Sequence, residues 1–413
     1  MKKVLGLKCI RCGKEYKLKE TKYNCLACGA NLDVVYDYTL VKKRLTYKTL
    51  DANPDRSVWR YIDILPVDDI DMVPPVHVGW TPLYKAQKLA ESLGISTLYI
   101  KDDGRNPSCS YKDRASAISV ARATEMEETV ITAASTGNAA ASLACMTGSL
   151  DVKTMIFVPQ TAPAPKVAQL LVFGANVIMV DGTYDDAFDL CIQASNEYGW
   201  YNRNTGYNAF TREGKKTCAF EICEQLEWET PDKVFVSAGD GNILSGLWKG
   251  FTDFKKLGII DKLPQMIAVQ AEHSNAIKLA FESADGEVKP VSGQTIADSI
   301  SVSMPRDAMA ALIALRESGG CAVTVTDDEI LKAIPEVARG VNVFAEPAGA
   351  ASYAGLKNAV RDGLVKDGES VVVIITGNGL KDINSAMRSV GTPYRIKPDI
   401  EELKKLVAAE KLA

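Results

Sequence analysis

Short apolar runs rich in Val and Ile recur along the chain from residue 98 onward. They cover residues 98–100, 129–132, 154–158, 177–180, 234–236, 266–269 and 371–375. Longer amphipathic stretches separate the runs. Apolar strands that alternate with helices are typical of a parallel sheet covered by helices on both faces. The pattern therefore predicts an α/β fold, in which ligands bind beyond the carboxyl ends of the strands.

Two close cysteine pairs stand near the N-terminus, and a glycine follows each pair. Cys9 pairs with Cys12 and Cys25 with Cys28, which gives the spacing C-x2-C-x12-C-x2-C. Four thiolates in two tight turns suit a tetrahedral Zn2+ ion. We therefore predict a zinc ribbon with a structural or docking role, and reduced buried or redox-active cysteines are the alternative. Its lysines are interleaved with glutamates, which favours a solvated surface over a grip on nucleic acid.

Composition and charge exclude several classes of protein. The 413 residues are 46% hydrophobic and 24% charged, as in ordinary globular proteins. A net charge of −4 provides no positive field for nucleic acid or anionic lipid. No apolar run approaches the roughly 18 residues of a membrane span, so we expect a cytoplasmic protein with no nucleic-acid or membrane partner. The two histidines, His77 and His273, argue against a Ser-His-Asp triad or a histidine metal site.

Four polar loops follow predicted strands, and the first contains Lys112. Residues 106–114 have the sequence NPSCSYKDR, and Lys112 stands where this loop passes into an Ala-rich helical stretch. A cationic neighbour such as Arg114 would lower the pKa of the Lys112 amine, as covalent binding of an aldehyde requires. Taken alone, a solvated charged triplet at a helix start is the simpler interpretation.

The second loop, STGN, contains Ser135, Thr136 and Asn138 between a strand and a helix. Its amides and hydroxyls either form an anion site or only cap the helix. The third loop, GDGN at residues 239–242, fits neither G-x-G-x-x-G nor a Walker loop, which disfavours dinucleotides and nucleoside triphosphates. A small glycine-rich loop of this kind can hold one phosphate monoester.

The fourth loop, TGNG, follows the last predicted strand and would present the Thr376 hydroxyl at the end of that strand. Alone it is a common turn. Together and in this order, however, the four motifs resemble the fold-type II pyridoxal-phosphate enzymes, most closely the threonine synthase family. The segment TGNGLKD at residues 376–382 is similar to one typical of threonine synthases, whose members often carry an N-terminal zinc ribbon. The resemblance spans residues 79–390 and implies a tryptophan synthase β-like fold with two α/β subdomains.

The resemblance implies a role for each motif residue. Lys112 would bind pyridoxal 5'-phosphate covalently as an imine, Asn138 would bond the ring hydroxyl O3', and Thr376 would meet the ring nitrogen N1. A neutral hydroxyl at N1 favours replacement and elimination over transamination. The residues implied to bind the phosphate of the cofactor are Gly239, Asp240, Gly241 and Asn242.

The implied substrate is the small molecule O-phosphohomoserine, which the enzyme would convert with water into threonine and phosphate. Its phosphate needs a second anion site. The segment NAFTREGKKT at residues 208–217 brings three cations together near a predicted helix start. The family pattern has Asn-Pro-Tyr-Arg where this chain has residues 208–211, so which cation binds the substrate phosphate stays open. The residues expected to bind it are Ser135, Thr136, Arg212 and Lys215.

These interpretations divide the chain into parts. The predicted parts are a zinc ribbon at residues 1–38, a proline-interrupted connector at 39–78, a larger pyridoxal-phosphate-binding subdomain at 79–117 and 206–390, a smaller α/β subdomain at 118–205 and a C-terminal helix at 391–413. A homodimer is the default expectation, because two-fold dimers are the commonest oligomers.

Other activities remain open. A sister enzyme would use the same cofactor for replacement on O-phosphoserine or for dehydration of serine or threonine. Cys109 and Tyr111 stand where the family pattern has Gly or Ala and Phe, which is compatible with another amino-acid substrate. Outside the enzymes, the alternative is a regulatory or nucleic-acid-binding protein with a zinc ribbon and an inactive catalytic half.

Overall fold

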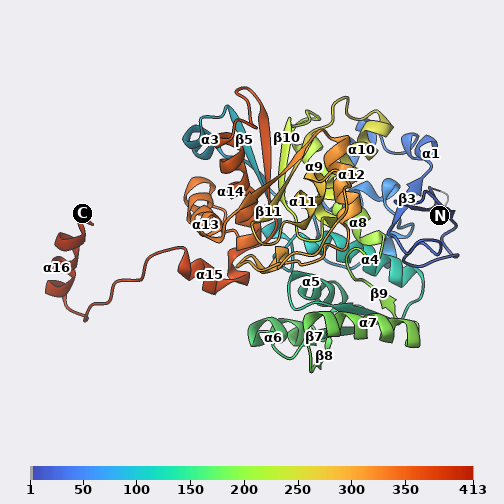
Figure 1. Cartoon of the computed structure of the whole chain (residues 1–413), viewed down its shortest axis with the longest axis horizontal. Helices are drawn as coiled ribbons and strands as arrows, with labels where there is room; N and C mark the ends of the chain where they lie inside the picture. Colours follow the sequence, from blue (N-terminus) through green and yellow to red (C-terminus); the bar gives the residue numbers. More distant parts are fainter. Residues whose placement is uncertain (1–2, 413) are drawn as a thin grey trace.

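The computed structural model describes residues 3–412, and its strands form three separate sheets. The predictions for residues 1–2 and 413, at the ends of the predicted ribbon and C-terminal helix, lie outside this range. In Figure 1 the largest sheet lies in the upper part of the molecule, a smaller sheet with its helices (green) lies below it, and the N-terminal strands lie at one side. This arrangement confirms the predicted α/β fold.

The largest sheet has six strands and is parallel except at one edge. In sheet order the strands are β12 (Cys321–Val325), β11 (Gln265–Ala271), β10 (Lys233–Ser237), β13 (Ser370–Ile375), β5 (Thr97–Asp102) and β4 (Leu83–Lys85). Only β4 runs antiparallel to its neighbour. Along β13, Val373 and Ile375 pack on one face of the sheet and Val372 and Ile374 pack on the other. Burial of both faces explains why these strands are continuous apolar runs in the sequence.

Two groups of helices cover this sheet. One face packs against α3 (Gln87–Leu93), α13 (Asp327–Val341) and α14 (Pro347–Arg361). The other packs against α8 (Phe210–Lys215), α9 (Thr217–Gln225), α10 (Asn242–Leu257), α11 (Ala276–Glu282) and α12 (Ala308–Glu317). Local sequence sets the helix ends: the Thr326 hydroxyl caps α13, and Gly258 ends α10 at φ +72°.

The smaller sheet has four parallel strands between helices. In sheet order they are β8 (Asn176–Val180), β7 (Lys153–Pro159), β6 (Val130–Ala134) and β9 (Tyr201–Asn202). The covering helices are α5 (Asn138–Thr147) and α6 (Ala164–Val172) on one face and α7 (Tyr184–Tyr198) on the other. Helix α4 (Lys112–Glu125) contacts both α5 and α8 and so links the two sheet systems. Because α4 crosses the predicted boundary between residues 117 and 118, the subdomain division stays a prediction.

All seven apolar runs named above are strands in the structure. The sequence pattern missed β4, β9 and β12. The first two are only 3 and 2 residues long. β12 is an edge strand with two partly exposed positions, so its hydrophobic signal is weaker than that of the fully buried β10.

The N-terminal module, residues 3–36, is an antiparallel sheet in the order β2-β1-β3. Its strands are β1 (Val4–Cys9), β2 (Glu15–Tyr16) and β3 (Leu32–Tyr36). Gly13 and Gly29 have φ of +73° and +71°, so the backbone turns in the left-handed region after each cysteine pair. Leu7 and Val34 belong to the main hydrophobic core. The module therefore packs directly on the body of the protein.

The predicted connector is also packed. It forms α1 (Tyr38–Lys42), α2 (Tyr47–Ala52) and two 3-10 helices, η1 (Val58–Ile64) and η2 (Ile70–Met72). Tyr61 and Leu65 are fully buried in the main core. The prolines do prevent a long regular element, but the segment is part of the folded body.

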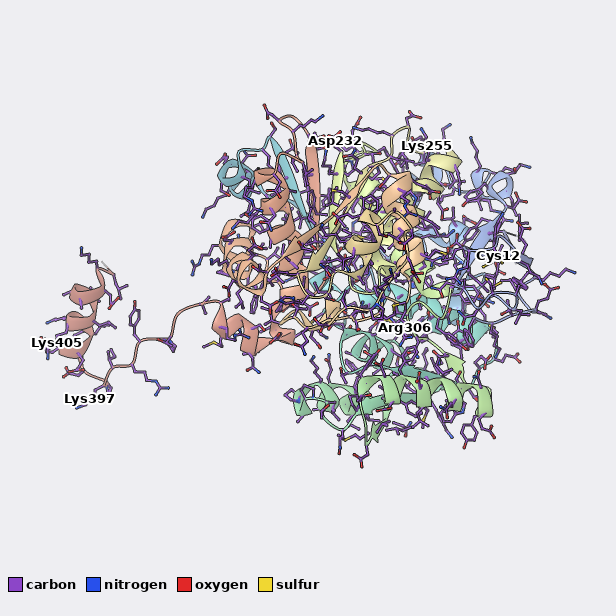
Figure 2. All side chains as sticks on the ribbon, viewed as in Figure 1. Cys12, Asp232, Lys255, Arg306, Lys397 and Lys405 are labelled. Atoms are coloured by element: carbon purple, nitrogen blue, oxygen red, sulfur yellow. The ribbon has the colours of Figure 1, made fainter. Side chains whose placement is uncertain are left out.

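The C-terminal segment leaves the body after α15 (Ile383–Arg388). Residues 391–399 are exposed and have no regular structure, so the C-terminal helix, α16 (Ile400–Glu410), begins later than predicted. Figures 1 and 2 show α16, with Lys397 and Lys405 on this segment, well apart from the rest of the molecule. No helix in residues 3–412 is long and apolar enough to cross a membrane.

Candidate active site

One cavity brings together residues from all four predicted loops. Its lining includes Lys112, Asn138, Gly239, Asp240, Gly241, Asn242 and Thr376. These residues follow β5, β6, β10 and β13, so the carboxyl ends of those strands meet at the cavity. Because β6 belongs to the smaller sheet and the others to the larger one, the cavity lies between the two. This is the place where parallel α/β folds bind their ligands.

Backbone hydrogen bonds hold two of these loops together. Tyr111 N–H donates to the Thr376 carbonyl at 2.8 Å, and Asn378 N–H donates to the Cys109 carbonyl at 3.1 Å. Lys112 is the first residue of α4, immediately after this contact. The amine of Lys112 and the Thr376 hydroxyl therefore stand on one fixed backbone arrangement.

The Lys112 amine is in a setting that favours its neutral form. Burial lowers the pKa of Lys112, and the Arg203 guanidinium lowers it further. The carboxylates of Asp240 and Glu346 act in the opposite direction but do not reverse the shift. The neutral amine is the nucleophilic form, so Lys112 is suited to attack an aldehyde.

Arg114, which the sequence placed beside Lys112, points away from the cavity. Its Nε donates to Asp103 Oδ2 at 2.6 Å, and its Nη2 donates to Glu221 Oε2 at 2.8 Å. Lys101 Nζ donates to the same Glu221 oxygen at 2.7 Å. All four side chains are fully buried. The cation that acts on Lys112 is therefore Arg203, and Arg114 holds α4 against α9 and the turn that follows β5.

The loop at residues 239–242 joins β10 to α10 and needs both of its glycines. Gly241 has φ +85°, and a Cβ there would lie 2.7 Å from the Ala311 Cβ. A Cβ on Gly239 would lie 2.9 Å from the Ile300 Cα. A glycine-rich loop that opens a long helix presents free backbone N–H groups, which together with the helix dipole form an anion site.

Lys215 lines the same cavity, beside this loop. Its Nζ donates to Asn242 Oδ1 at 2.5 Å. Burial lowers the pKa of Lys215 well below its usual range, and the charges of Lys112 and Arg203 lower it further. Among residues 3–412, no carboxylate lies within salt-bridge distance of Lys215. A bound anion would relieve this repulsion.

Arg203 is a further buried cation that the sequence did not reveal. Its Nε donates to Ser116 Oγ at 3.0 Å and its Nη1 to Thr205 Oγ1 at 3.1 Å, while Nη2 has no hydrogen-bond partner in the described part of the chain. Burial lowers its pKa to about 10. Arg203 follows the two-residue strand β9, which is too short to mark a strand end in a hydrophobic pattern. It adds to the positive charge of Lys112 and Lys215, an excess suited to a dianion.

Asn138 opens α5 and contacts a buried carboxylate. Its Nδ2 lies 2.9 and 3.0 Å from the two carboxylate oxygens of Glu346 and 3.1 Å from Ser299 Oγ. Burial raises the pKa of Glu346. The sequence analysis missed Glu346, although a glutamate directly before Pro347 at the start of α14 was an available signal. Glu346 orients the amide that is expected to meet the cofactor ring.

A second cavity adjoins the first and shares Asn138, Ser299 and Glu346 with it. Lys166 of α6 pairs with Asp298 at 2.5 Å, and Lys381 Nζ donates to the Ser108 carbonyl at 2.8 Å. The other lining residues with polar side chains or sulfur include Cys109, Thr136, Lys166 and Lys381. Two amines and a hydroxyl lie here beside three carboxylates, Asp298, Glu346 and Asp382, so an anion would have to take Lys166 from Asp298.

The structure separates the residues predicted to bind the substrate phosphate. Thr136 lines the second cavity, whereas Lys215 lines the first. Ser135 lines neither, and its Oγ accepts from Gly137 N–H at 3.2 Å. The hydroxyls of the STGN loop are therefore divided between an anion position and the loop's own backbone.

Arg212 also lines neither cavity. Its Nη2 donates to Asp307 at 2.6 Å, and its Nη1 donates to Asp33 of the N-terminal module at 3.1 Å. The structure places this guanidinium in ion pairs with carboxylates of the protein. The sequence did not reveal these pairs, because both partners come from segments distant in the chain.

The four N-terminal cysteines have the geometry of a metal site. Their sulfur atoms all lie within 4.8 Å of one another. The Cys9 and Cys28 sulfurs are 3.5 Å apart, and those of Cys12 and Cys25 are 3.6 Å apart. Four thiolates about 2.3 Å from a tetrahedral zinc are about 3.8 Å apart. The backbone N–H groups of Arg11 and Cys12 lie 3.4 Å from the Cys9 sulfur, where they stabilise a thiolate. The residues present fit a tetrahedral Zn2+ ion.

Comparison with known proteins agrees with this geometry. The pyridoxal-phosphate dependent enzyme family matches residues 75–377. Threonine synthase of Methanocaldococcus jannaschii is 41% identical over 402 residues, 97% of this chain and 98% of that protein. Threonine synthase of Mycobacterium tuberculosis is 37% identical over 333 residues, 80% of this chain and 89% of that protein. The chain therefore belongs to the pyridoxal-phosphate-dependent enzymes.

Within that family its relatives are threonine synthases. That of Methanosarcina acetivorans is 38% identical over 97% of this chain and 98% of its own length. Among solved structures, threonine deaminase isoform 2 of Solanum lycopersicum superposes with a TM-score of 0.64 at 24% identity, over 76% of this chain and 88% of that one. Maize serine racemase gives a TM-score of 0.61 at 19% identity, over 80% and 93%. These two likenesses support the fold-type II architecture.

Proposed function

We propose that the chain is a threonine synthase, which converts O-phosphohomoserine and water into threonine and phosphate. The observation that carries this proposal is the convergence of Lys112, Asn138, Thr376 and residues 239–242 on one cavity. When bound there, pyridoxal 5'-phosphate would supply the electron sink that makes protons beside its imine acidic. The remaining work falls to side chains of this chain.

Each wall of the first cavity would hold one part of the cofactor. Lys112 would bind the aldehyde, Asn138 the ring hydroxyl and Thr376 the ring nitrogen. The amides of residues 239–242 would bind the phosphate, and we assign Lys215 to the same phosphate because it lies beside that loop. An excess of buried cations without carboxylate partners supports this assignment.

The substrate phosphate would bind in the second cavity. Arg212 is held by carboxylates of the protein. The cations that would bind the substrate phosphate are instead Lys166 and Lys381. Thr136 would donate its hydroxyl to the same phosphate, and Ser135 would support the loop. Lys166 would exchange its pairing with Asp298 for the dianion when substrate binds.

Lys112 would also move protons. When not bound to the cofactor, its amine would take a proton from the α carbon of the substrate and then one from the β carbon. Burial and the Arg203 charge lower the pKa of Lys112, so that the basic neutral amine is populated nearer to neutral pH. Phosphate would depart from the γ carbon with its bonding electrons, a proton would return to that carbon, water would add its hydroxyl at the β carbon, and a second proton would restore the α carbon.

The test combines a spectrum with a product assay. Purified protein should absorb in the visible range because of its bound cofactor. Borohydride should abolish this absorption and leave the reduced cofactor attached to Lys112. Phosphate release and threonine formation from O-phosphohomoserine should exceed phosphate release from O-phosphoserine. A preference for O-phosphoserine would instead support the sister replacement activity.

We further propose that Cys9, Cys12, Cys25 and Cys28 hold a structural Zn2+ ion, on the strength of the sulfur geometry. We also infer a cytoplasmic homodimer without nucleic-acid or membrane partners. The net charge of −4 supports the lack of a nucleic-acid partner. Metal analysis of the purified protein and its mass in solution test these points.

A further inference from the structure

Asp307 is a fully buried carboxylate whose two oxygens serve different parts of the molecule. Oδ1 accepts from Asn31 Nδ2 of the N-terminal module at 2.9 Å and from Arg212 Nη2 at 2.6 Å. Oδ2 accepts from Asn242 Nδ2 at 2.7 Å and from Ser245 Oγ at 2.8 Å. One side chain thus connects the cysteine-bearing module with the loop that is proposed to hold the cofactor phosphate.

The backbone around Asp307 also touches that loop. Asp307 N–H donates to the Asp240 carbonyl at 3.0 Å, and Arg306 N–H donates to Asp240 Oδ1 at 3.0 Å. A Cβ on Gly241 would lie 3.3 Å from the Asp307 carbonyl oxygen. Figure 2 labels Arg306, which lies near the junction of the two sheet systems. Residues 240–242 are therefore held from behind by residues 306–307.

The module is tied to the same place by a second route. Asp33 of β3 accepts from Arg212 Nη1 at 3.1 Å and from Lys249 Nζ at 3.0 Å. Lys249 lies on α10, the helix that the phosphate loop opens. Arg212 bridges the half-buried Asp33 and the buried Asp307, so module and loop share two carboxylates and one guanidinium. Asp33, Arg212, Lys249 and Asp307 themselves do not line the cavity.

We propose that Asp307 is a positioning residue that couples the N-terminal module to the cofactor's phosphate, so that the folded, metal-loaded module raises affinity for pyridoxal 5'-phosphate. The proposal rests on the proposed function. A buried carboxylate with four donors is rigid, and the loss of one donor disturbs the others. The amides of residues 240–242 then lose the alignment that a phosphate requires.

Asn31 offers the cleanest way to break the connection, because it is only half-buried and belongs to the module. Lys22 is the matched control: it also lies on the module and ties it to the body, through Glu128 at 2.6 Å, but it shares no hydrogen bond or ion pair with Asp307 in residues 3–412. The experiment compares Asn31→Ala, Lys22→Ala and wild type as full-length chains freed of cofactor. Each is titrated with pyridoxal 5'-phosphate and with pyridoxal, and the visible absorption gives the Kd.

We expect Asn31→Ala to weaken binding of pyridoxal 5'-phosphate on the order of three- to tenfold, as loss of one bond to a charged group implies. Binding of pyridoxal, which has no phosphate, should change little, and Lys22→Ala should match wild type with both. Asp307→Asn should lower the ratio of the two affinities further. A merely structural role would weaken both ligands together, and that result, or an unchanged ratio in Asn31→Ala, would overturn the proposal.

Metal removal provides an independent arm. Chelation should lower the affinity of the wild type and of Lys22→Ala for pyridoxal 5'-phosphate, but should lower that of Asn31→Ala by a smaller factor, because this variant already lacks one of the two links. A wild type that contains no metal, or whose affinity ignores metal removal, contradicts the coupling. If the wild type binds neither ligand, the proposed function fails as well. If the wild type binds both ligands but the variants do not show the expected affinities, this inference alone fails.

Discussion

Two buried charge clusters lie near the start of α4, and only one of them is balanced. The balanced cluster consists of Lys101, Arg114, Asp103 and Glu221, with two cations against two carboxylates. The cavity cluster consists of Lys112, Lys215 and Arg203. None of these three has a carboxylate within salt-bridge distance in residues 3–412.

The difference separates groups that stabilise the fold from groups that await a ligand. Removing one partner of a satisfied buried pair leaves an uncompensated charge and destabilises the protein. Removing a repelled cation has the opposite or no effect on folding, but takes away part of an anion site. Both kinds of cation are buried, so burial alone does not reveal which role a residue has.

The largest effect is expected from Lys112→Ala. The variant loses the amine that binds the cofactor and moves both protons, so threonine formation should fall on the order of a thousandfold or more. Thermal unfolding of the cofactor-free chain should be unchanged or shifted upward, since a buried amine without a carboxylate partner is removed. Phosphate release and calorimetry measure the two effects. A variant with near wild-type turnover would remove Lys112 from the mechanism.

Arg114→Met should act on the fold instead. It leaves Asp103 and Glu221 short of a partner, and the free energy of unfolding should drop by about 3–5 kcal/mol. Urea denaturation of the cofactor-free chain measures the loss. The control is Lys404→Met on α16, where an exposed pair with Glu401 contributes about 0–1 kcal/mol. Equal stability of the two variants would contradict the balanced cluster.

Lys215 and Lys216 are adjacent, both are buried, and they sharpen the contrast. Lys216 pairs with Glu213 at 2.6 Å and with Asp253 at 2.8 Å. Lys215→Met should weaken pyridoxal 5'-phosphate binding about ten- to hundredfold with little change in stability of the cofactor-free chain. Lys216→Met should lower the stability of the cofactor-free chain and leave pyridoxal 5'-phosphate binding little changed. Cofactor titration and urea denaturation of both variants measure these effects. Equal losses of affinity and of stability in the two variants would contradict the proposed difference between Lys215 and Lys216.

The smallest effect concerns acid stability. Burial alone would raise the pKa of Glu221, but Arg114 and Lys101 more than offset this and lower the pKa to about 2, from an ordinary 4.5. A carboxylate with a lowered pKa stabilises the fold above its ordinary pKa, and this contribution is lost as pH falls from 4.5 towards 2. Glu221→Gln should be less stable at neutral pH and show a shallower loss between these limits. Urea midpoints across this pH range measure the slopes, which differ by about 1.4 kcal/mol per pH unit at most.

Much of the fold could be predicted because its central strands are buried on both faces. Such strands are continuous apolar runs, and all seven that the sequence pattern marked are strands in the structure. Each of the four motifs directly follows one of them or opens the next helix, so the strand ends also located the cavity. The edge strand β12 and the short β4 and β9 have weaker signals because fewer of their residues face a core.

The roles of individual cations could not be predicted in the same way. Arg212 and Lys215 lie three residues apart on the short helix α8, and only the fold shows that Asp33 and Asp307 approach one and not the other. The two carboxylate partners of Arg212 come from segments about 180 residues earlier and 95 residues later in the chain. Glu346 and Arg203 were missed for the same reason, because their significance depends on neighbours that are distant in sequence.

The walls of the first cavity come from both sheets, with Asn138 at the end of β6 and Thr376 at the end of β13. A cofactor that is covalently joined to Lys112 and bonded on both sides would add a further brace between two halves that α4 and the main core already connect. Ligand binding stabilises the native state by an amount that grows with the logarithm of the ratio of ligand concentration to Kd. Loaded molecules should therefore unfold at a higher temperature and more cooperatively than empty ones.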